Sequence, residues 1–120
     1  MINLLIVDDE TSIAELLAEV FSLEGFNCDC SYSGNQAIQK LADKKFDLII
    51  SDVKMGDGDG PSLLNHVKTK DLGIPLIFIT GHSEFTENEL RDQGALQVFY
   101  KPLDLDQFIQ EIKVISKTLS

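Results

Sequence analysis

The stretch LLIVDDE, residues 4–10, joins a short apolar run to three consecutive acidic residues. An apolar run of this length, bounded by charges, is typical of a strand that is covered on both faces of a sheet. Four further strand-like runs follow it along the chain: Asn27–Ser31, Phe46–Ser51, Pro75–Ile79 and Gln97–Tyr100. Helical patterns separate all five runs, and this alternation predicts a parallel α/β sheet.

The connecting segments carry apolar residues at helical spacing, and each has a start signal. We expect helices to start at Thr11 or Ser12, at Ser33, at Pro61 and at Asp104, and the fourth helix to follow Ser83. The last helix is the clearest, because one apolar stripe runs from Leu105 to Leu119. We therefore expect a (βα)5 fold with an open, doubly wound sheet, since a closed barrel needs about 200 residues or more.

The composition and net charge of the chain disfavour some classes of binding partner. The chain has 120 residues and a formal net charge of -10, so we expect residues 1–120 to form one domain. An acidic surface disfavours both nucleic acids and anionic membranes. No apolar run is as long as a membrane span, and the N-terminus lacks the pattern of a signal peptide, so a cytoplasmic location is expected.

The two cysteines, Cys28 and Cys30, lie two positions apart in an expected strand. Strand alternation points both side chains to one face, in a geometry that strains a disulfide. We interpret them as packing residues, because a metal site would need further cysteine or histidine ligands nearby.

Reactive side chains stand at four of the five expected strand ends. Asp8 and Asp9 follow the first run, Asp52 the third, Thr80 the fourth and Lys101 the fifth. Parallel strands end at one edge of the sheet, where ligands of open α/β folds bind. Two carboxylates about 4 Å apart repel by about 4 kcal/mol at an effective dielectric constant near 20, so this group favours a cation. Oxygen ligands suit Mg²⁺, with Mn²⁺ as the alternative.

Asp52 is the natural nucleophile of this set, since a carboxylate can accept a phosphoryl group as an acyl phosphate. The charge on a transferring phosphoryl group spreads over three oxygens, which need separate stabilisers. The cation, Lys101 and Thr80 together with a loop N–H can supply them.

These residues, in this order, resemble the receiver domains of two-component response regulators over essentially the whole chain. The motifs that carry the resemblance are Leu4–Glu10, Asp52-Val53-Lys54-Met55, Ile79-Thr80-Gly81, Gly94-Ala95 and Lys101-Pro102. The resemblance implies a flavodoxin-like sheet with strand order 2-1-3-4-5. It also implies a cis peptide bond before Pro102.

The resemblance further implies that Asp52 is phosphorylated by a phosphohistidine of a sensor histidine kinase or phosphotransfer protein. Mg²⁺ would be held by Asp9, Asp52 and the main-chain carbonyl of Lys54, with Asp8 acting mainly through metal-bound water. Such a domain catalyses its own phosphorylation and dephosphorylation and is not a turnover enzyme. Its output is implied to be protein contact or dimerisation through the last two helices and the last strand, where Phe85 is a candidate contact if exposed.

The chain departs from the family pattern at two places. The loop Met55–Gly60 has glycine at positions 56 and 58, where the family commonly has proline and methionine, and we expect glycine to loosen it. Val98 occupies the place of the family's switch aromatic, three residues before Lys101. Strand alternation puts Tyr100 on the same face as Val98.

Lys54 and His82 are two residues beyond Asp52 and Thr80, where a receiver side chain would flank the path of an attacking water. We expect Lys54 to shield the acyl phosphate and prolong its lifetime. Two other functions stay open: a phosphate-independent, receiver-like interaction module, and a phosphatase of the haloacid-dehalogenase type. The phosphatase is disfavoured because it needs an Asp-x-Asp motif after the first strand.

Overall fold

The computed structural model describes residues 1–81 and 85–119, and within them five strands alternate with five helices. The strands are β1 Asn3–Val7, β2 Asn27–Ser31, β3 Leu48–Asp52, β4 Leu76–Thr80 and β5 Gln97–Tyr100. The helices are α1 Thr11–Leu23, α2 Gly34–Asp43, α3 Gly60–Thr69, α4 Glu87–Asp92 and α5 Leu105–Lys117. Of the described helices, none is both long and apolar enough to cross a membrane.

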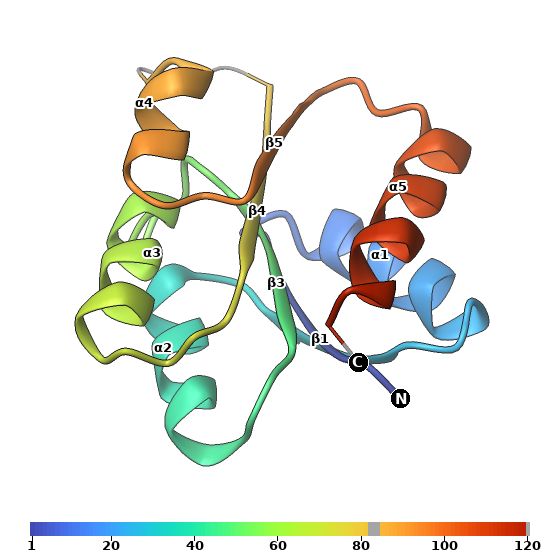
Figure 1. Cartoon of the computed structure of the whole chain (residues 1–120), viewed down its shortest axis with the longest axis horizontal. Coiled ribbons are helices and arrows are strands. Elements are labelled where there is room, and N and C mark those ends of the chain that lie inside the picture. Colours follow the sequence, from blue (N-terminus) through green and yellow to red (C-terminus); the bar gives the residue numbers. More distant parts are fainter. Residues whose placement is uncertain (82–84, 120) are drawn as a thin grey trace.

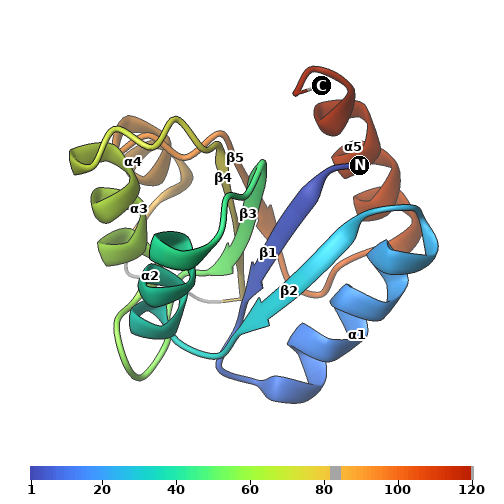
Figure 2. The ribbon, with the colours of Figure 1, turned by 90° about the horizontal axis from the view of Figure 1, so that it is seen from below.

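The strands form one parallel sheet in the order β2-β1-β3-β4-β5 (Figures 1 and 2). Helices α1 and α5 cover one face, and α2, α3 and α4 cover the other (Figure 1). The expected doubly wound, flavodoxin-like architecture is therefore confirmed. The strand order reverses between β1 and β3, which places a topological switch point between their carboxyl ends.

Strand alternation divides the core into two layers. In β1, Leu5 and Val7 join the cluster beneath α2, α3 and α4, whereas Leu4 and Ile6 join the cluster beneath α1 and α5. All four side chains are almost completely buried. A strand buried on both faces must be apolar at every position, which explains why the run has no polar alternation.

Two strands begin and end later than their apolar runs predict. Phe46 is buried but precedes β3, whose pairing with β1 starts at Leu48 opposite Leu4. Strand β4 begins at Leu76 because Pro75 has no N–H to donate to the ladder, although its carbonyl accepts from Ile49. As a consequence, the reactive residues at these two ends belong to the strands themselves.

Three expected helix starts are confirmed. Ser33 caps α2 by accepting the N–H of Gln36, and Asp104 caps α5 by accepting that of Gln107. Pro61 lies in the first turn of α3, where its missing N–H costs nothing.

Of the other two helices, α1 differs from expectation in its cap, whereas α4 lies where the sequence places it. Neither Thr11 nor Ser12 caps α1: the N-cap is Glu10, whose carbonyl accepts the N–H groups of Ile13 and Ala14. Helix α4 follows Ser83 as expected and starts at Glu87 behind a Thr86 capping box, whereas Ser83 itself lies outside the described residues. Six residues make α4 the shortest of the described helices.

Both cysteine thiols are free and half-buried on the face of β2 that packs against α1. The Sγ of Cys30 lies 3.4 Å from the carbonyl oxygen of Ala14. Burial raises the pKa of both thiols, which keeps them protonated at neutral pH. The interpretation of Cys28 and Cys30 as packing residues is thereby supported.

Candidate functional site

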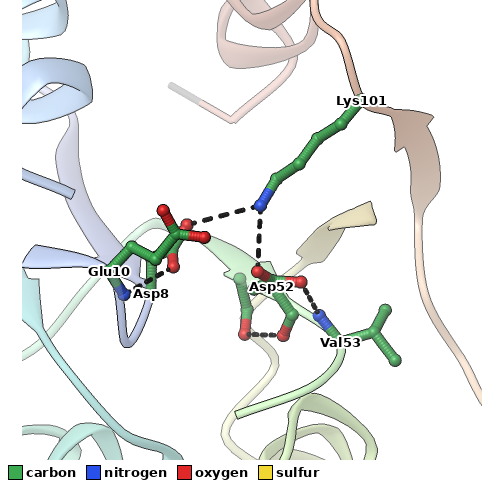
Figure 3. A network of polar contacts seen from close by, with 6 residues as sticks. Asp8, Glu10, Asp52, Val53 and Lys101 are labelled. Carbon is green, nitrogen blue, oxygen red and sulfur yellow. Dashed lines mark hydrogen bonds and ion pairs between the residues drawn. The ribbon is translucent and has the colours of Figure 1, made fainter. Parts of the chain in front are cut away.

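Four strands bring reactive residues to the carboxyl edge of the sheet, as the sequence predicts. Figure 3 shows three of these side chains, Asp8, Asp52 and Lys101, close together. Asp52 and Thr80 are the last residues of β3 and β4. Asp8 and Lys101 directly follow β1 and β5. The four strand ends lie together because every strand of the sheet runs in the same direction.

Asp52 is held by both of its carboxylate oxygens. Its Oδ1 accepts the backbone N–H of Val53 at 2.7 Å, and its Oδ2 lies 3.1 Å from Lys101 Nζ. The side chain is 12% exposed, so one part of the carboxylate still faces solvent. A carboxylate held in this way is oriented but accessible, as a nucleophile must be.

Asp8 is the most deeply buried acid of the site. Desolvation by burial raises its pKa from the ordinary value of 3.8 to about 6, and the charges of Asp52 and Asp9 act in the same direction. A hydrogen bond from the Glu10 N–H, at 3.0 Å, and the charge of Lys101 oppose this rise. Asp8 is therefore more easily protonated than an ordinary aspartate.

Lys101 is the ammonium group shared by this set. Burial alone would lower its pKa, but the hydrogen bond to Asp52 and the charges of Asp52, Asp8 and Glu10 raise it above the ordinary value. Its Nζ is nearer to Asp52, at 3.1 Å, than to Asp8, at 3.9 Å. The peptide bond between Lys101 and Pro102 is cis, which confirms the expectation.

The acidic residues are close enough to share one cation. Asp8, Asp9 and Asp52 each present a carboxylate oxygen, and these oxygens lie within 4.8 Å of one another. Asp9, Asp52, Lys54 and Lys101 all line one pocket of about 620 Å³. Three convergent carboxylates beside an open pocket fit a hard divalent cation that keeps some of its water. The acidic cluster can therefore bind a metal ion.

Thr80 is 2% exposed, and no described residue makes a hydrogen bond to its Oγ1. A buried hydroxyl without a partner costs about 1–3 kcal/mol, so this group is available to a ligand.

Ser31 Oγ, at the end of β2, is also buried and lacks a partner within the described part of the chain. Nothing in the sequence distinguishes Ser31 from the many serines found near turns, so it is not among the expected site residues.

Several contributors to the site carry no signal in the sequence. The backbone N–H of Val53 is the shortest contact of Asp52, and any residue except proline could supply it. Glu10 and Gly81 line the same pocket as Asp52. His82, expected to flank the site, lies outside the described residues.

The loop between β3 and α3 is better fastened than its glycines suggest. Gly56 is exposed with open space around it, in line with the expected freedom. Gly58, however, has a φ of +85°, and its carbonyl accepts the Gly34 N–H at 2.9 Å. The second glycine thus permits a backbone conformation and a close contact that a methionine would not, so it does not simply loosen the loop.

The residues near the expected output surface are arranged as alternation predicts. Val98 is 6% exposed and belongs to the core layer beneath α4, whereas Phe99 points to the opposite layer and packs on Phe108. Tyr100 is 53% exposed and pairs in register with Thr80. Phe85 is half-buried against the core, so the condition for its role as an exposed contact is not met.

Comparison with known proteins agrees with this geometry. Residues 4–113 match the family model described as "Response regulator receiver domain". The chain is 34% identical to the transcriptional regulatory protein ZraR of Salmonella typhimurium over 113 residues, which are 93% of this chain and 26% of that protein. It is 35% identical to sporulation initiation phosphotransferase F of Bacillus subtilis, over 92% of this chain and 90% of that protein.

Among solved structures, the response regulator TrrA of Thermotoga maritima, in complex with Mg(2+)-BeF, has a TM-score of 0.83 and 28% identity. The alignment covers 94% of this chain and 97% of TrrA. The chain spans about a quarter of the length of ZraR, and nearly the whole of the phosphotransferase.

Proposed function

Because the chain belongs to the family of response regulator receiver domains, we propose that residues 1–120 form one such domain, in which Asp52 accepts a phosphoryl group. The donor is a phosphohistidine of a sensor histidine kinase or a histidine phosphotransfer protein. The observation that carries the proposal is the position of Asp52, whose Oδ2 lies 3.1 Å from Lys101 Nζ within an acidic cluster.

In the proposed reaction, a carboxylate oxygen of Asp52 forms a bond to phosphorus while the bond between phosphorus and the donor imidazole nitrogen breaks. The imidazole keeps the electron pair and takes up a proton as it leaves. Lys101 stabilises negative charge on the phosphoryl oxygens, and the unpartnered hydroxyl of Thr80 donates a hydrogen bond to one of them. Val53 keeps the Asp52 carboxylate oriented through its N–H.

Asp9, Asp52 and the main-chain carbonyl of Lys54 are the residues that would hold Mg²⁺, or Mn²⁺ as the alternative, with Asp8 acting mainly through bound water. When bound, the cation neutralises part of the negative charge that the acids and the phosphoryl group bring together. The oxygen-only donor set within 4.8 Å supports this assignment, and so does the Mg(2+)-BeF bound by the similar TrrA.

The proposed output is a protein contact or a dimer through the surface formed by α4, β5 and α5. Tyr100 on β5 and Val114 on α5 support it, since they are 53% and 63% exposed. Exposed aromatic and apolar side chains of this kind are typical of partner contacts. The domain itself contacts neither nucleic acid nor membrane, in accord with its net charge of -10. It modifies only itself and does not turn over a separate substrate.

Beryllofluoride with Mg²⁺, which mimics an aspartyl phosphate, tests the proposal. We expect it to shift the amide resonances around Thr80 and Lys101 in the wild-type chain, and intact-mass measurement to detect one phosphoryl group after incubation with a phosphohistidine donor. Asp52→Asn should lose both effects, whereas Asp106→Asn, a change at an exposed acid on α5, should keep them.

The alternative, a phosphate-independent interaction module, is favoured by one observation: Val98 fills the place of the family's switch aromatic and is buried there. If the wild-type chain shows no beryllofluoride-dependent shift at Thr80 or Lys101, this alternative replaces the phosphoacceptor function.

A further inference from the structure

The loop between β3 and α3 is attached to the start of α2 by four hydrogen bonds that phosphoryl transfer itself does not use. Asp57 Oδ1 accepts from Asn35 Nδ2 at 2.8 Å, and Asp57 Oδ2 accepts from Ser33 Oγ at 3.3 Å. The backbone N–H groups of Asn35 and Gly34 donate to the carbonyls of Asp57, at 3.1 Å, and Gly58, at 2.9 Å. We call this set of contacts the Asp57 latch.

The two backbones approach so closely at the latch that Gly34 and Gly58 have no room for a side chain. A Cβ on Gly34 would collide with the carbonyl of Gly58. A Cβ on Gly58 would lie 2.8 Å from Asn35 Oδ1, and the φ of +85° at Gly58 already disfavours other residues. The latch therefore depends on glycine on both sides of the contact.

Charge also favours the latch. The Asp57 carboxylate lies at the N-terminus of α2, where the positive end of the helix dipole stabilises an anion. Ser33 accepts the Gln36 N–H and donates to Asp57, so the helix cap and the latch form one chain of hydrogen bonds.

The latch restrains the segment that borders the phosphoacceptor. Lys54, Met55 and Gly56 line the pocket with Asp52, and they lie between the end of β3 and Asp57. Within this segment Met55 is buried in the core, but Gly56 has no atom near the position of a Cβ. The path of the backbone from Lys54 onward is thus determined by Met55 on one side and the latch on the other.

We infer that Asp57 is a positioning residue for the cation site: it fastens the loop to α2 and so keeps the Lys54 carbonyl beside the carboxylates of Asp9 and Asp52. The inference rests on the proposed function, because that function assigns the Lys54 carbonyl to the cation. Asp57 acts through the loop backbone and does not itself contact the ion or the phosphoryl group.

The test compares Mg²⁺ affinity, by calorimetric titration, with amide hydrogen exchange of residues 54–58 in the metal-free chain. We expect Asp57→Ala to weaken Mg²⁺ binding by about 10-fold, as the loss of an outer-shell partner does, and to speed exchange in the loop. Asp57→Asn should restore most of the affinity, because an amide can keep the contacts with Asn35 and Ser33 without the charge.

Asp59→Ala is the matched control. Asp59 lies in the same loop and carries the same charge, but it caps α3 by accepting the Ser62 N–H and takes no part in the latch through its side chain. Its loss should lower stability and leave Mg²⁺ affinity close to that of the wild type. If Asp57→Ala does not fold, Asn35→Ala removes the shorter side-chain bond and should weaken Mg²⁺ binding in the same direction.

The possible results distinguish a failure of the inference about Asp57 from a failure of the proposed function. A wild-type chain that binds Mg²⁺, with an Asp57→Ala or Asn35→Ala variant that binds it equally well, overturns the inference alone. An equal loss of affinity in Asp59→Ala and Asp57→Ala also overturns it, because the effect would then follow general loop stability. A wild-type chain that binds no Mg²⁺ overturns the proposed cation site and the inference with it.

Discussion

At the scale of single residues, Asp8 meets two conflicting demands. The proposed cation site needs it ionised, but burial raises its pKa to about 6 and disfavours the charge. Lys101 offsets this only in part, since its Nζ lies nearer to Asp52. The ionised form of Asp8 therefore lowers the stability of the fold, and the proposed cation site is the reason we assign to this cost.

Replacement of Asp8 by asparagine should stabilise the metal-free chain. The raised pKa means that the folded state binds more protons than the unfolded state, so the contribution of Asp8 to stability is fully present below about pH 3.8 and is lost as the pH rises through about 6. At pH 7.5, in urea denaturation, we expect Asp8→Asn to raise the free energy of unfolding by about 1–2 kcal/mol. Asparagine keeps an acceptor for the Glu10 N–H.

The gain should disappear near pH 4, where Asp8 in the wild type is protonated. Asp106→Asn, which removes an equal charge from an exposed position, should change stability by less than about 0.5 kcal/mol at either pH. A variant that is no more stable than the wild type at pH 7.5 would contradict the raised pKa.

Lys54 should control the lifetime of the phosphorylated form. Its side chain is exposed at the pocket that contains Asp52, where a long cation can obstruct an attacking water. We expect Lys54→Ala to lose phosphate several-fold faster than the wild type, measured by intact mass over time. Lys45→Ala, at an exposed lysine outside the residues lining this pocket, is the control; unchanged or slower loss in Lys54→Ala would refute the idea.

At the scale of elements, the alternation of side chains along β5 places three consecutive residues in three different environments. Val98 faces the core beneath α4, Phe99 packs edge-on against Phe108 of α5 with ring centroids 4.9 Å apart, and Tyr100 faces solvent beside Thr80. The family's switch aromatic therefore has no counterpart at position 98.

An aromatic residue at position 98 should be poorly tolerated. Val98 is 6% exposed among close-packed side chains, so Val98→Phe must displace its neighbours and should lower the free energy of unfolding by about 1–3 kcal/mol. Tyr100→Phe, on the same face but 53% exposed, should have little effect. Urea denaturation measures both, and a Val98→Phe variant as stable as the wild type would show that room for the ring exists.

At the scale of the whole molecule, the parallel sheet explains why distant residues form one site. Asp8, Asp52, Thr80 and Lys101 are spread over more than ninety positions, yet each stands at the carboxyl end of its strand. The strand order reverses between β1 and β3, and the pocket lined by Asp9, Asp52 and Lys101 lies at the carboxyl ends of the strands, where such a reversal favours a binding site. Of the 20 acidic residues, three are gathered there by topology, so their mutual repulsion favours a cation.

The sequence by itself determined the alternation of strands and helices, the doubly wound class and the strand-end residues of the site. Those features follow from local periodicity and from the rule that parallel strands end at one edge, neither of which needs a distance between remote residues. For the same reason, β2 and β5 have the bounds that their patterns predict.

Only the tertiary structure decided what depends on such distances. The burial that raises the pKa of Asp8, the preference of Lys101 for Asp52, and the N–H of Val53 on the Asp52 carboxylate are properties of the folded arrangement. The same holds for the Asp57 latch, in which glycines that suggest freedom in the sequence permit a close contact with α2. Local pattern specifies which elements form, whereas solvation and contact geometry arise only when those elements pack together.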